Sequence, residues 1–137
     1  MRTVFADTSY WIALLNPKDQ AHDIAVDVSK GLGSCRMITT EEVLTEFLNY
    51  FGARGPYLRS AAAKLVERMQ ADRSIQILPQ THEGFVTGLR LYQTRPDKGY
   101  SLTDCISMEA MRWEGLREVL TTDEHFSQEG FTCLLER

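Results

Sequence analysis

The sequence contains few cysteines and no long apolar run. Its three cysteines lie far apart and form no CxxC pair, which argues against a disulfide framework and against a zinc knuckle. No apolar stretch approaches the roughly 20 residues that a membrane span needs. Asp7 interrupts the segment that a signal peptide would occupy. We therefore expect a protein of the reducing cytoplasm that has no membrane partner.

The chain also lacks an excess of basic residues. Its formal net charge of −4 argues mildly against a nucleic-acid-binding protein. The charge is unevenly distributed, because residues 54–98 hold eight Lys and Arg against four Asp and Glu, and the remainder therefore carries −8. This asymmetry allows a basic face beside an acidic site, although an ordinary solvated helix surface also explains it. Within this segment, we expect Arg54 and Arg59 to bind the phosphates of a substrate.

The length and the hydrophobic pattern predict one α/β domain over residues 1–137. The chain is long enough for one core and too short for two ordinary domains. Short apolar runs predict strands at residues 3–6, 35–39, 74–79 and 118–122, with a last edge strand at 131–135. Helical spacing predicts helices through residues 10–15, 20–32, 43–51, 57–72, 81–93 and 101–113. Strands that alternate with helices indicate a mainly parallel central sheet.

Polar residues at the ends of the predicted strands form the candidate site. Asp7 follows the first strand directly and precedes a helix that Thr8 or Ser9 would cap, and ligands of parallel α/β sheets bind at such strand ends. Two pairs have the spacing of a capping box: Thr39 with Glu42, and Ser101 with Asp104. Taken singly, Asp7, Asp104 and Asp123 are explained by capping, because aspartate is a preferred capping residue.

Glu46 lies in the middle of a predicted helix, where capping does not explain it. It borders an apolar stripe that includes Val43 and Tyr50. A carboxylate beside a buried face needs a partner or a metal, unless its stem lies along the core and its head reaches water. This helix is apolar around most of its circumference. Either the next helix or a second chain is therefore expected to cover its outer face.

The acids are more informative together than singly. Four of them are expected at one edge of the sheet: Asp7, Glu46, Asp104 and Asp123. Without a cation they would repel one another and raise each other's pKa values. Their oxygen ligands suit Mg²⁺ or Mn²⁺ rather than zinc, and such sites commonly support phosphoryl transfer. The histidines lack zinc-ligand spacing, and surface or capping roles are expected for all three: His22, His82 and His125.

Four segments, in order, resemble the signatures of PIN domains, and in particular those of VapC-type toxin ribonucleases. They are Asp7-Thr8-Ser9, residues 39–46, Ser101-Leu102-Thr103-Asp104 with Ala110 following, and residues 121–126. The resemblance covers nearly the whole chain and implies a three-layer α/β/α fold. It also implies a metal-dependent endoribonuclease whose acidic site comprises Asp7, Glu46, Asp104 and Asp123. Thr8 or Ser9 would be supporting polar groups.

The same resemblance implies an RNA substrate, a homodimer and a small antitoxin protein as partner. Two alternatives stay open on the sequence alone. One is a PIN-like module that binds RNA or a protein without cleaving it. The other is a different metal-dependent phosphoesterase, such as a DNA nuclease or a phosphatase. The four intact acids favour the ribonuclease.

Overall fold

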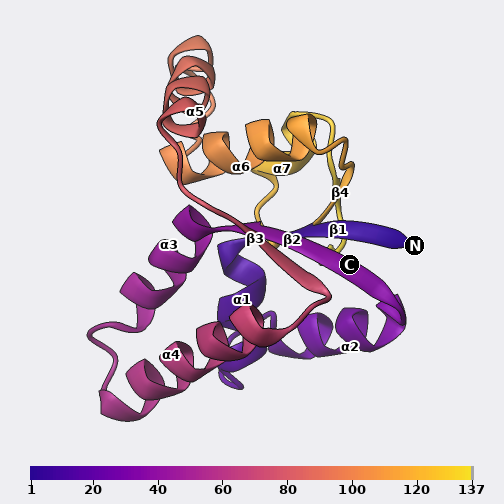
Figure 1. The fold of residues 1–137 in the computed structure, drawn as a ribbon, viewed down its shortest axis with the longest axis vertical. Helices are drawn as coiled ribbons and strands as arrows, with labels where there is room; N and C mark the ends of the chain where they lie inside the picture. The colour runs from indigo at the N-terminus through magenta and orange to yellow at the C-terminus, as the bar shows by residue number, and fades with distance from the viewer. Residues whose placement is uncertain (137) are drawn as a thin grey trace.

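A five-stranded sheet forms the centre of the computed structural model, which describes residues 1–136 (Figure 1). The strands are β1 Arg2–Ala6, β2 Cys35–Thr40, β3 Ile75–Leu78, β4 Glu118–Leu120 and β5 Thr132–Cys133. Their order is β3-β2-β1-β4-β5, and each neighbouring pair is parallel. The predicted mainly parallel sheet is thus confirmed, and it is fully parallel within residues 1–136.

Helices cover both faces of this sheet and make the three predicted layers. The helices are α1 Thr8–Leu15, α2 His22–Leu32, α3 Glu41–Phe51, α4 Pro56–Ala71, α5 His82–Thr94, α6 Leu102–Trp113 and α7 His125–Gln128. Figure 1 shows α1, α2 and α4 on one face, and α5, α6 and α7 on the other. The helix α3 leaves the carboxyl end of β2 and runs toward α4. Among residues 1–136, every helix is too short or too polar to span a membrane.

The central strand β1 places Asp7 where the connections of the sheet diverge. Val4, Phe5 and Ala6 are completely buried, as expected for a strand with helices on both faces. The chain continues from β1 to β2 on one side, whereas β4 pairs with the other side of β1. The backbone N–H of Asp7 donates to the carbonyl of Leu120 at 3.1 Å. Asp7 therefore lies at a topological switch point, where ligands of such sheets bind.

The starts of α1 and α6 and the end of β4 test three predictions about element ends. The N-cap of α1 is Asp7 rather than Thr8 or Ser9, and its side chain makes no capping hydrogen bond. The predicted capping box of Ser101 and Asp104 at the start of α6 is confirmed. The strand β4 ends at Leu120 rather than at residue 122. The predicted strand end was therefore two residues too late, and a loop rather than a strand end carries Asp123.

The prediction that Thr39 caps α3 was also wrong. The cap is Thr40, whose hydroxyl accepts a hydrogen bond from the backbone N–H of Val43 at 3.1 Å. The neighbouring Thr39 is completely buried, and its hydroxyl donates to the carbonyl of Ala6 at 2.8 Å. The strand β2 continues to Thr40, one residue beyond its predicted end. Thr39 therefore lies inside the strand, where its hydroxyl links β2 to β1.

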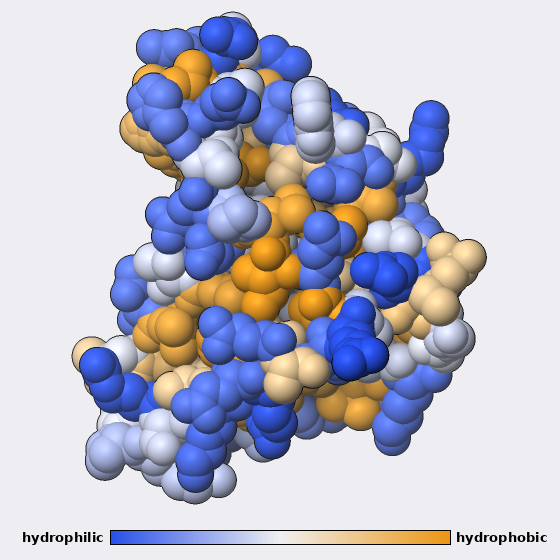
Figure 2. Space-filling view, in the orientation of Figure 1, coloured by the Kyte–Doolittle hydropathy of each residue, from blue (hydrophilic) through white to orange (hydrophobic). Residues whose placement is uncertain are grey.

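Its own chain covers much of the apolar surface of α3, as in the first of the two predicted alternatives, but Leu48 of this helix stays 36% exposed. Val43, Phe47 and Phe51 are completely buried, and α3 packs against α1, α4 and α6. Tyr57 at the start of α4 is exposed as well, and the larger group of exposed apolar side chains lies on α5 and at the end of α6: Phe85, Val86, Leu89, Tyr92 and Trp113. A groove of about 600 Å³ lies between these two helices and the end of β3. In Figure 2, the outline of the molecule is indented below α5, and apolar surface lies beside this indentation.

Candidate active site

A pocket of about 290 Å³ lies at the carboxyl end of β1. Its lining comprises Asp7, Thr8, Ser9, Ile12, Glu46, Tyr50, Asp104 and Asp123. The structure thus brings all four predicted acids into one pocket, together with both predicted hydroxyl residues. The two predicted substrate-binding arginines do not line it.

Asp7 is the most buried acid of this pocket, with 4% of its surface exposed. Its Oδ2 atom accepts a hydrogen bond from the hydroxyl of Thr121 at 2.8 Å. Its Oδ1 atom is buried and has no hydrogen-bond partner among residues 1–136. A buried carboxylate oxygen that lacks a donor is costly, because its water has been removed without replacement. This oxygen is therefore suited to bind a cation.

The hydroxyl of Thr121 connects β1 to the loop after β4. It has one proton, which is directed to Asp7, so Ser9 is the donor in its 3.1 Å contact with Thr121. The Thr121 oxygen also accepts the backbone N–H of Asp123 at 3.0 Å, and Ser9 accepts that of Thr122 at 3.0 Å. These hydrogen bonds hold the loop that carries Asp123 against the start of α1. Ser9 and Thr121 therefore position the acids.

Glu46 enters the pocket from α3. Thr40 caps the start of this helix, and its buried side chains Val43 and Phe47 pack into the core. The helix packs against α1, and Glu46 lies between these two buried positions. Glu46 is half-buried and makes no hydrogen bond or ion pair with another described residue. Tyr50 lies one turn further along and lines the same pocket.

Asp104 combines a capping role with a place in the pocket. Its Oδ2 atom accepts the backbone N–H of Ser101 at 3.1 Å, and its own N–H donates to the Ser101 hydroxyl at 3.0 Å. These two bonds fix the first turn of α6 and hold the carboxyl group in one orientation. The residue is only 8% exposed. Capping is therefore confirmed for Asp104, and it leaves the carboxyl group in the lining of the pocket.

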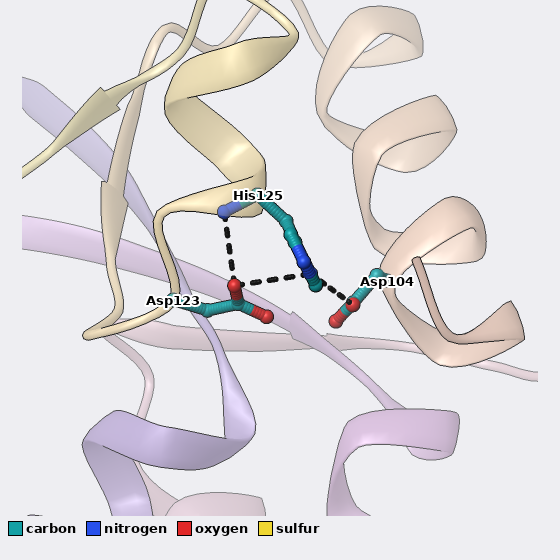
Figure 3. A group of neighbouring side chains, drawn as sticks. All are labelled: Asp104, Asp123 and His125. Carbon is teal, nitrogen blue, oxygen red and sulfur yellow. Dashed lines mark hydrogen bonds and ion pairs between the residues drawn. The ribbon is translucent and has the colours of Figure 1, made fainter. Parts of the chain in front are cut away.

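Asp123 and His125 form the remaining side of the site (Figure 3). The Oδ1 atom of Asp123 accepts the backbone N–H of His125 at 2.9 Å. The Nδ1 atom of His125 lies 3.2 Å from this oxygen and 3.5 Å from the Oδ2 atom of Asp104. Donor atoms of Asp104, Asp123 and His125 all lie within 4.8 Å of one another. The loop after β4 thus brings a nitrogen next to two carboxylates.

Two acids of the pocket, Asp7 and Asp104, have raised pKa values. Burial raises the pKa of Asp7 to about 7, and the charges of Asp104 and Glu46 add to this rise. Burial likewise raises the pKa of Asp104, and the charge of Asp123 adds to it. The Thr121 hydroxyl lowers the pKa of Asp7 without cancelling the effect of burial. A cation among these carboxylates would reverse the shifts by favouring their charged forms.

The two predicted substrate-binding arginines lie beyond the C-terminal end of α3. The guanidinium of Arg54 lies over the ring of Tyr50, 3.6 Å from its centroid, and also donates to the Tyr50 carbonyl. Arg54 therefore adjoins a residue of the pocket wall. Arg59 donates to the carbonyl of Gly52 at 2.9 Å, which satisfies a carbonyl at the end of the helix. The rest of the basic segment is spread over α4, α5 and the loops that follow them, and the two helices cover opposite faces of the sheet (Figure 1).

Three residues of the site were not among those predicted from the sequence. Thr121 bonds to Asp7, Tyr50 lines the pocket, and His125 faces two of the acids. Tyr50 had a usable signal, because it lies four residues after Glu46 on the same helix face. His125 had a weaker one, its position two residues after Asp123. The surface or capping role expected for it was wrong.

The donor set of the pocket fits a divalent metal ion. Asp7, Glu46, Asp104 and Asp123 offer carboxylate oxygens, which are the ligands that hard divalent cations prefer. The unpartnered Oδ1 atom of Asp7 is a donor that lacks a protein partner within the described chain. Among residues 1–136, no arginine or lysine lines the pocket to balance these charges.

Comparison with known proteins agrees with this geometry. The crystal structure of Mycobacterium tuberculosis VapC20, described as a sarcin-ricin loop cleaving toxin, is similar with a TM-score of 0.82 at 25% identity, covering 94% of this chain and 96% of that one. Rickettsia felis VapBC2, bound to a DNA fragment from its promoter, shares the fold with a TM-score of 0.68 at 14% identity, covering 96% of both chains. No curated protein matches significantly. The PIN domain family model matches residues 4–131, which run from β1 to just before β5, and the chain belongs to this family.

Proposed function

We propose that the chain is a Mg²⁺- or Mn²⁺-dependent endoribonuclease that hydrolyses RNA phosphodiester bonds, and that it is the toxin of a toxin–antitoxin pair. One observation carries this proposal. Four carboxylates converge on a single pocket, one each from the end of β1, from α3, from α6 and from the loop after β4. The buried Oδ1 atom of Asp7 in this pocket has no hydrogen-bond partner among the described residues. The likeness to VapC20, which is described as a cleaving toxin, supports RNA as the substrate. The whole of residues 1–137 would act as one cytoplasmic nuclease domain.

Each acid has a separate role in this proposal. Asp7 and Asp104 are the principal ligands, because they are the most buried acids of the pocket and are each held by a hydrogen bond. Glu46 and Asp123 hold a second ion or orient the attacking water. A divalent cation supplies charge neutralisation and a water of lowered pKa in such sites. Thr8 and Ser9 line the pocket beside Asp7 as supporting polar groups.

The reaction needs no covalent enzyme intermediate. The oxygen of a water attacks phosphorus, the bond from phosphorus to the leaving oxygen breaks, and the leaving oxygen takes up a proton. No Ser or Cys of the described pocket contacts a histidine that would activate it as a nucleophile. Arg54, which adjoins the pocket wall, and Arg59 hold the RNA backbone through their positive charges.

A homodimer and an antitoxin are proposed as the protein partners. The exposed apolar side chains of α5 and the groove beside them are suited to another protein chain. Light scattering over a wide concentration range tests the homodimer. A strictly monomeric species at every concentration would contradict it.

An RNA cleavage assay tests the activity. Wild-type protein is expected to cleave RNA with Mg²⁺ or Mn²⁺ and to stop when EDTA is added. Asp7→Ala and Asp104→Ala are expected to cleave roughly a hundredfold to a thousandfold more slowly, the usual loss when a group that stabilises the transition-state charge is removed. Glu46→Ala and Asp123→Ala are expected to be impaired. Asp97→Ala, on an exposed loop, is the matched control and should cleave normally.

Two results would overturn the mechanism. One is cleavage that persists in EDTA, and the other is cleavage by a folded Asp7→Ala protein. Circular dichroism of each variant checks the fold. Binding of RNA without cleavage of any RNA tested would favour a binding module instead.

A further inference from the structure

We propose that His125 is a nitrogen ligand of this site, and that with Asp104 and Asp123 it holds a transition-metal ion such as Mn²⁺ in preference to Mg²⁺. This inference rests on the proposed function only in treating the acidic pocket as a metal site. The inference adds His125 to the four acids as a fifth metal-binding residue. It also states which of two metals, Mn²⁺ or Mg²⁺, binds more tightly.

The spacing of the donor atoms is the first reason. The Nδ1 atom of His125 lies 3.2 Å from Asp123 Oδ1 and 3.5 Å from Asp104 Oδ2 (Figure 3). Two ligands that each lie about 2.1 Å from one ion are separated by roughly 3.0 Å in octahedral and 3.4 Å in tetrahedral geometry. The observed separations are close to this range. The three side chains therefore need little movement to share one ion.

The state of the histidine nitrogen is the second reason. His125 Nδ1 is buried, yet it makes no hydrogen bond of normal geometry with any residue from 1 to 136. Its contacts with Asp104 and Asp123 are close in distance but are not directed as an N–H donor requires. A buried ring nitrogen whose partners are two carboxylates at ion-pair distance, without a well-directed hydrogen bond, is incompletely satisfied. A metal ion would use its lone pair and the two carboxylates together.

A second buried atom without a hydrogen bond belongs to Asp7, which lines the pocket beside Asp104 and Asp123. Asp7 is more than nine-tenths buried, and its Oδ1 atom lacks a hydrogen-bond partner within the described chain. Asp7 lines the pocket together with Asp104 and Asp123. Asp7 after β1 and His125 at the start of α7 thus each have a buried atom without a hydrogen bond, on either side of Asp104 and Asp123, as expected where a ligand completes the site.

The surrounding residues hold the imidazole in this position. The backbone N–H of His125 is bound by Asp123, and its ring packs against the ring of Tyr100, with centroids 5.2 Å apart. The Tyr100 hydroxyl donates to Glu129 at 2.9 Å, and Glu129 pairs with two arginines. Figure 3 shows the nitrogen-bearing edge of the ring turned toward both carboxyl groups. Such outer partners commonly orient metal-binding histidines.

The chemistry of the donors decides the metal. Mg²⁺ favours oxygen ligands and keeps much of its water, whereas imidazole suits ions further along the transition series. Mn²⁺ accepts both oxygen and nitrogen donors. Replacing the imidazole by a side chain without this nitrogen should therefore weaken Mn²⁺ binding more than Mg²⁺ binding.

Spectroscopy of Mn²⁺ tests the ligand directly. Electron–nuclear double resonance of the wild-type protein, labelled with ¹⁵N-histidine and loaded with Mn²⁺, should show a ¹⁵N coupling. The coupling should disappear in His125→Gln and persist in His82→Gln, which replaces an exposed histidine at the start of α5. Calorimetry should show at least tenfold weaker Mn²⁺ binding in His125→Gln, with Mg²⁺ binding changed less than threefold.

The outcomes separate this inference from the proposed function. If Mn²⁺ binds, needs Asp7 and Asp104, and shows no ¹⁵N coupling in the wild type, His125 is no ligand and the inference is wrong, while the acidic site stands. If Mn²⁺ does not bind at all, both fail. The measurement on wild-type protein does not depend on whether His125→Gln folds.

Discussion

Asp7 and Glu129 are two buried carboxylates in surroundings of opposite charge. Glu129, whose side chain is 6% exposed, contacts Arg95 and Arg112 and accepts the Tyr100 hydroxyl. These partners lower its pKa despite its burial. Asp7 has acids as its charged neighbours, and its pKa is raised. Within residues 1–136, the chain therefore supplies counter-charges for Glu129, whereas it supplies none for Asp7.

This comparison assigns stability to one cluster and chemistry to the other. A buried charge that keeps its counter-charge within the chain ties elements together, here α6 and the loop before it to the end of α7. A buried charge among like charges opposes folding, so its presence calls for another explanation. The metal site proposed at Asp7 is such an explanation.

The largest effect is expected when the satisfied cluster is broken. Glu129→Ala leaves two arginines without their buried partner, and we expect it to cost about 2–3 kcal/mol, because the arginines are partly exposed and are screened by water. Thermal unfolding in EDTA should show a melting temperature lower by roughly 10 °C. Glu118→Ala removes a surface pair with Arg2 and serves as the control, with little expected change. Equal losses in the two variants would contradict the comparison.

The opposite sign is expected for Asp7→Asn. The folded pKa of Asp7 is about 7, well above its ordinary value of 3.8, so the folded state binds a proton between these values that the unfolded state releases. Wild-type stability in EDTA should therefore fall as the pH rises from 4 to 7. The full shift corresponds to on the order of 4 kcal/mol, and relaxation of the pocket would reduce this to about 2 kcal/mol.

Chemical denaturation of Asp7→Asn in EDTA measures this effect. The variant should be more stable than the wild type at pH 8 by about 2 kcal/mol, and the dependence on pH between 4 and 7 should be weaker. Added Mn²⁺ should stabilise the wild type and not the variant. Asp97→Asn, on an exposed loop, is the control. An Asp7→Asn protein less stable than the wild type at pH 8 would show that the pocket does not strain the fold.

The architecture was largely predictable from the sequence, because the spacing of apolar residues changes between strand and helix along the chain. The errors lie at element ends. Thr39 and Thr40 are both able to cap a helix, and the strand pairing of β2 decides that Thr40 does so. In the same way, the extended residues after Leu120 resemble a strand, although the ladder with β1 ends at that residue.

The pocket was predictable as far as strand ends and helix faces determine it. Asp7 and Asp104 follow from local signals, a strand end and a capping box. Thr121 and His125 lie in the segment 121–126 that resembles a PIN signature, but their contacts with Asp7 and Asp104 depend on how the loop after β4 packs against β1 and α6, which local patterns do not determine. The roles of the acids in catalysis and metal binding stay predictions.

A smaller effect is expected from loosening Asp7 without removing it. Thr121→Val keeps the volume of a completely buried side chain but deletes the hydroxyl that contacts Asp7 and the N–H of Asp123. We expect metal affinity or cleavage to fall about tenfold, the lower end for partners of metal ligands. Thr39→Val is the matched control, since its buried hydroxyl bonds to the Ala6 carbonyl and to none of the carboxyl groups. Both should lose similar stability, and a similar loss of activity in both would rule out a specific role for Thr121.

The smallest effect is expected at the rim, where Arg54 and Arg59 carry the same charge in different settings. Arg54 lies over Tyr50 beside the pocket, whereas Arg59 bonds to the Gly52 carbonyl. Arg54→Glu should therefore weaken RNA binding several-fold and reduce the salt slope by about 0.7 for each single-strand phosphate that the protein no longer neutralises. Arg59→Glu should change affinity less and lower the melting temperature slightly, because it removes a cap. Fluorescence anisotropy with catalytically inactive Asp7→Asn protein at several salt concentrations measures both variants. Equal losses of affinity would indicate that the two arginines act through general charge, and unchanged affinity in both would remove them from the RNA-binding surface.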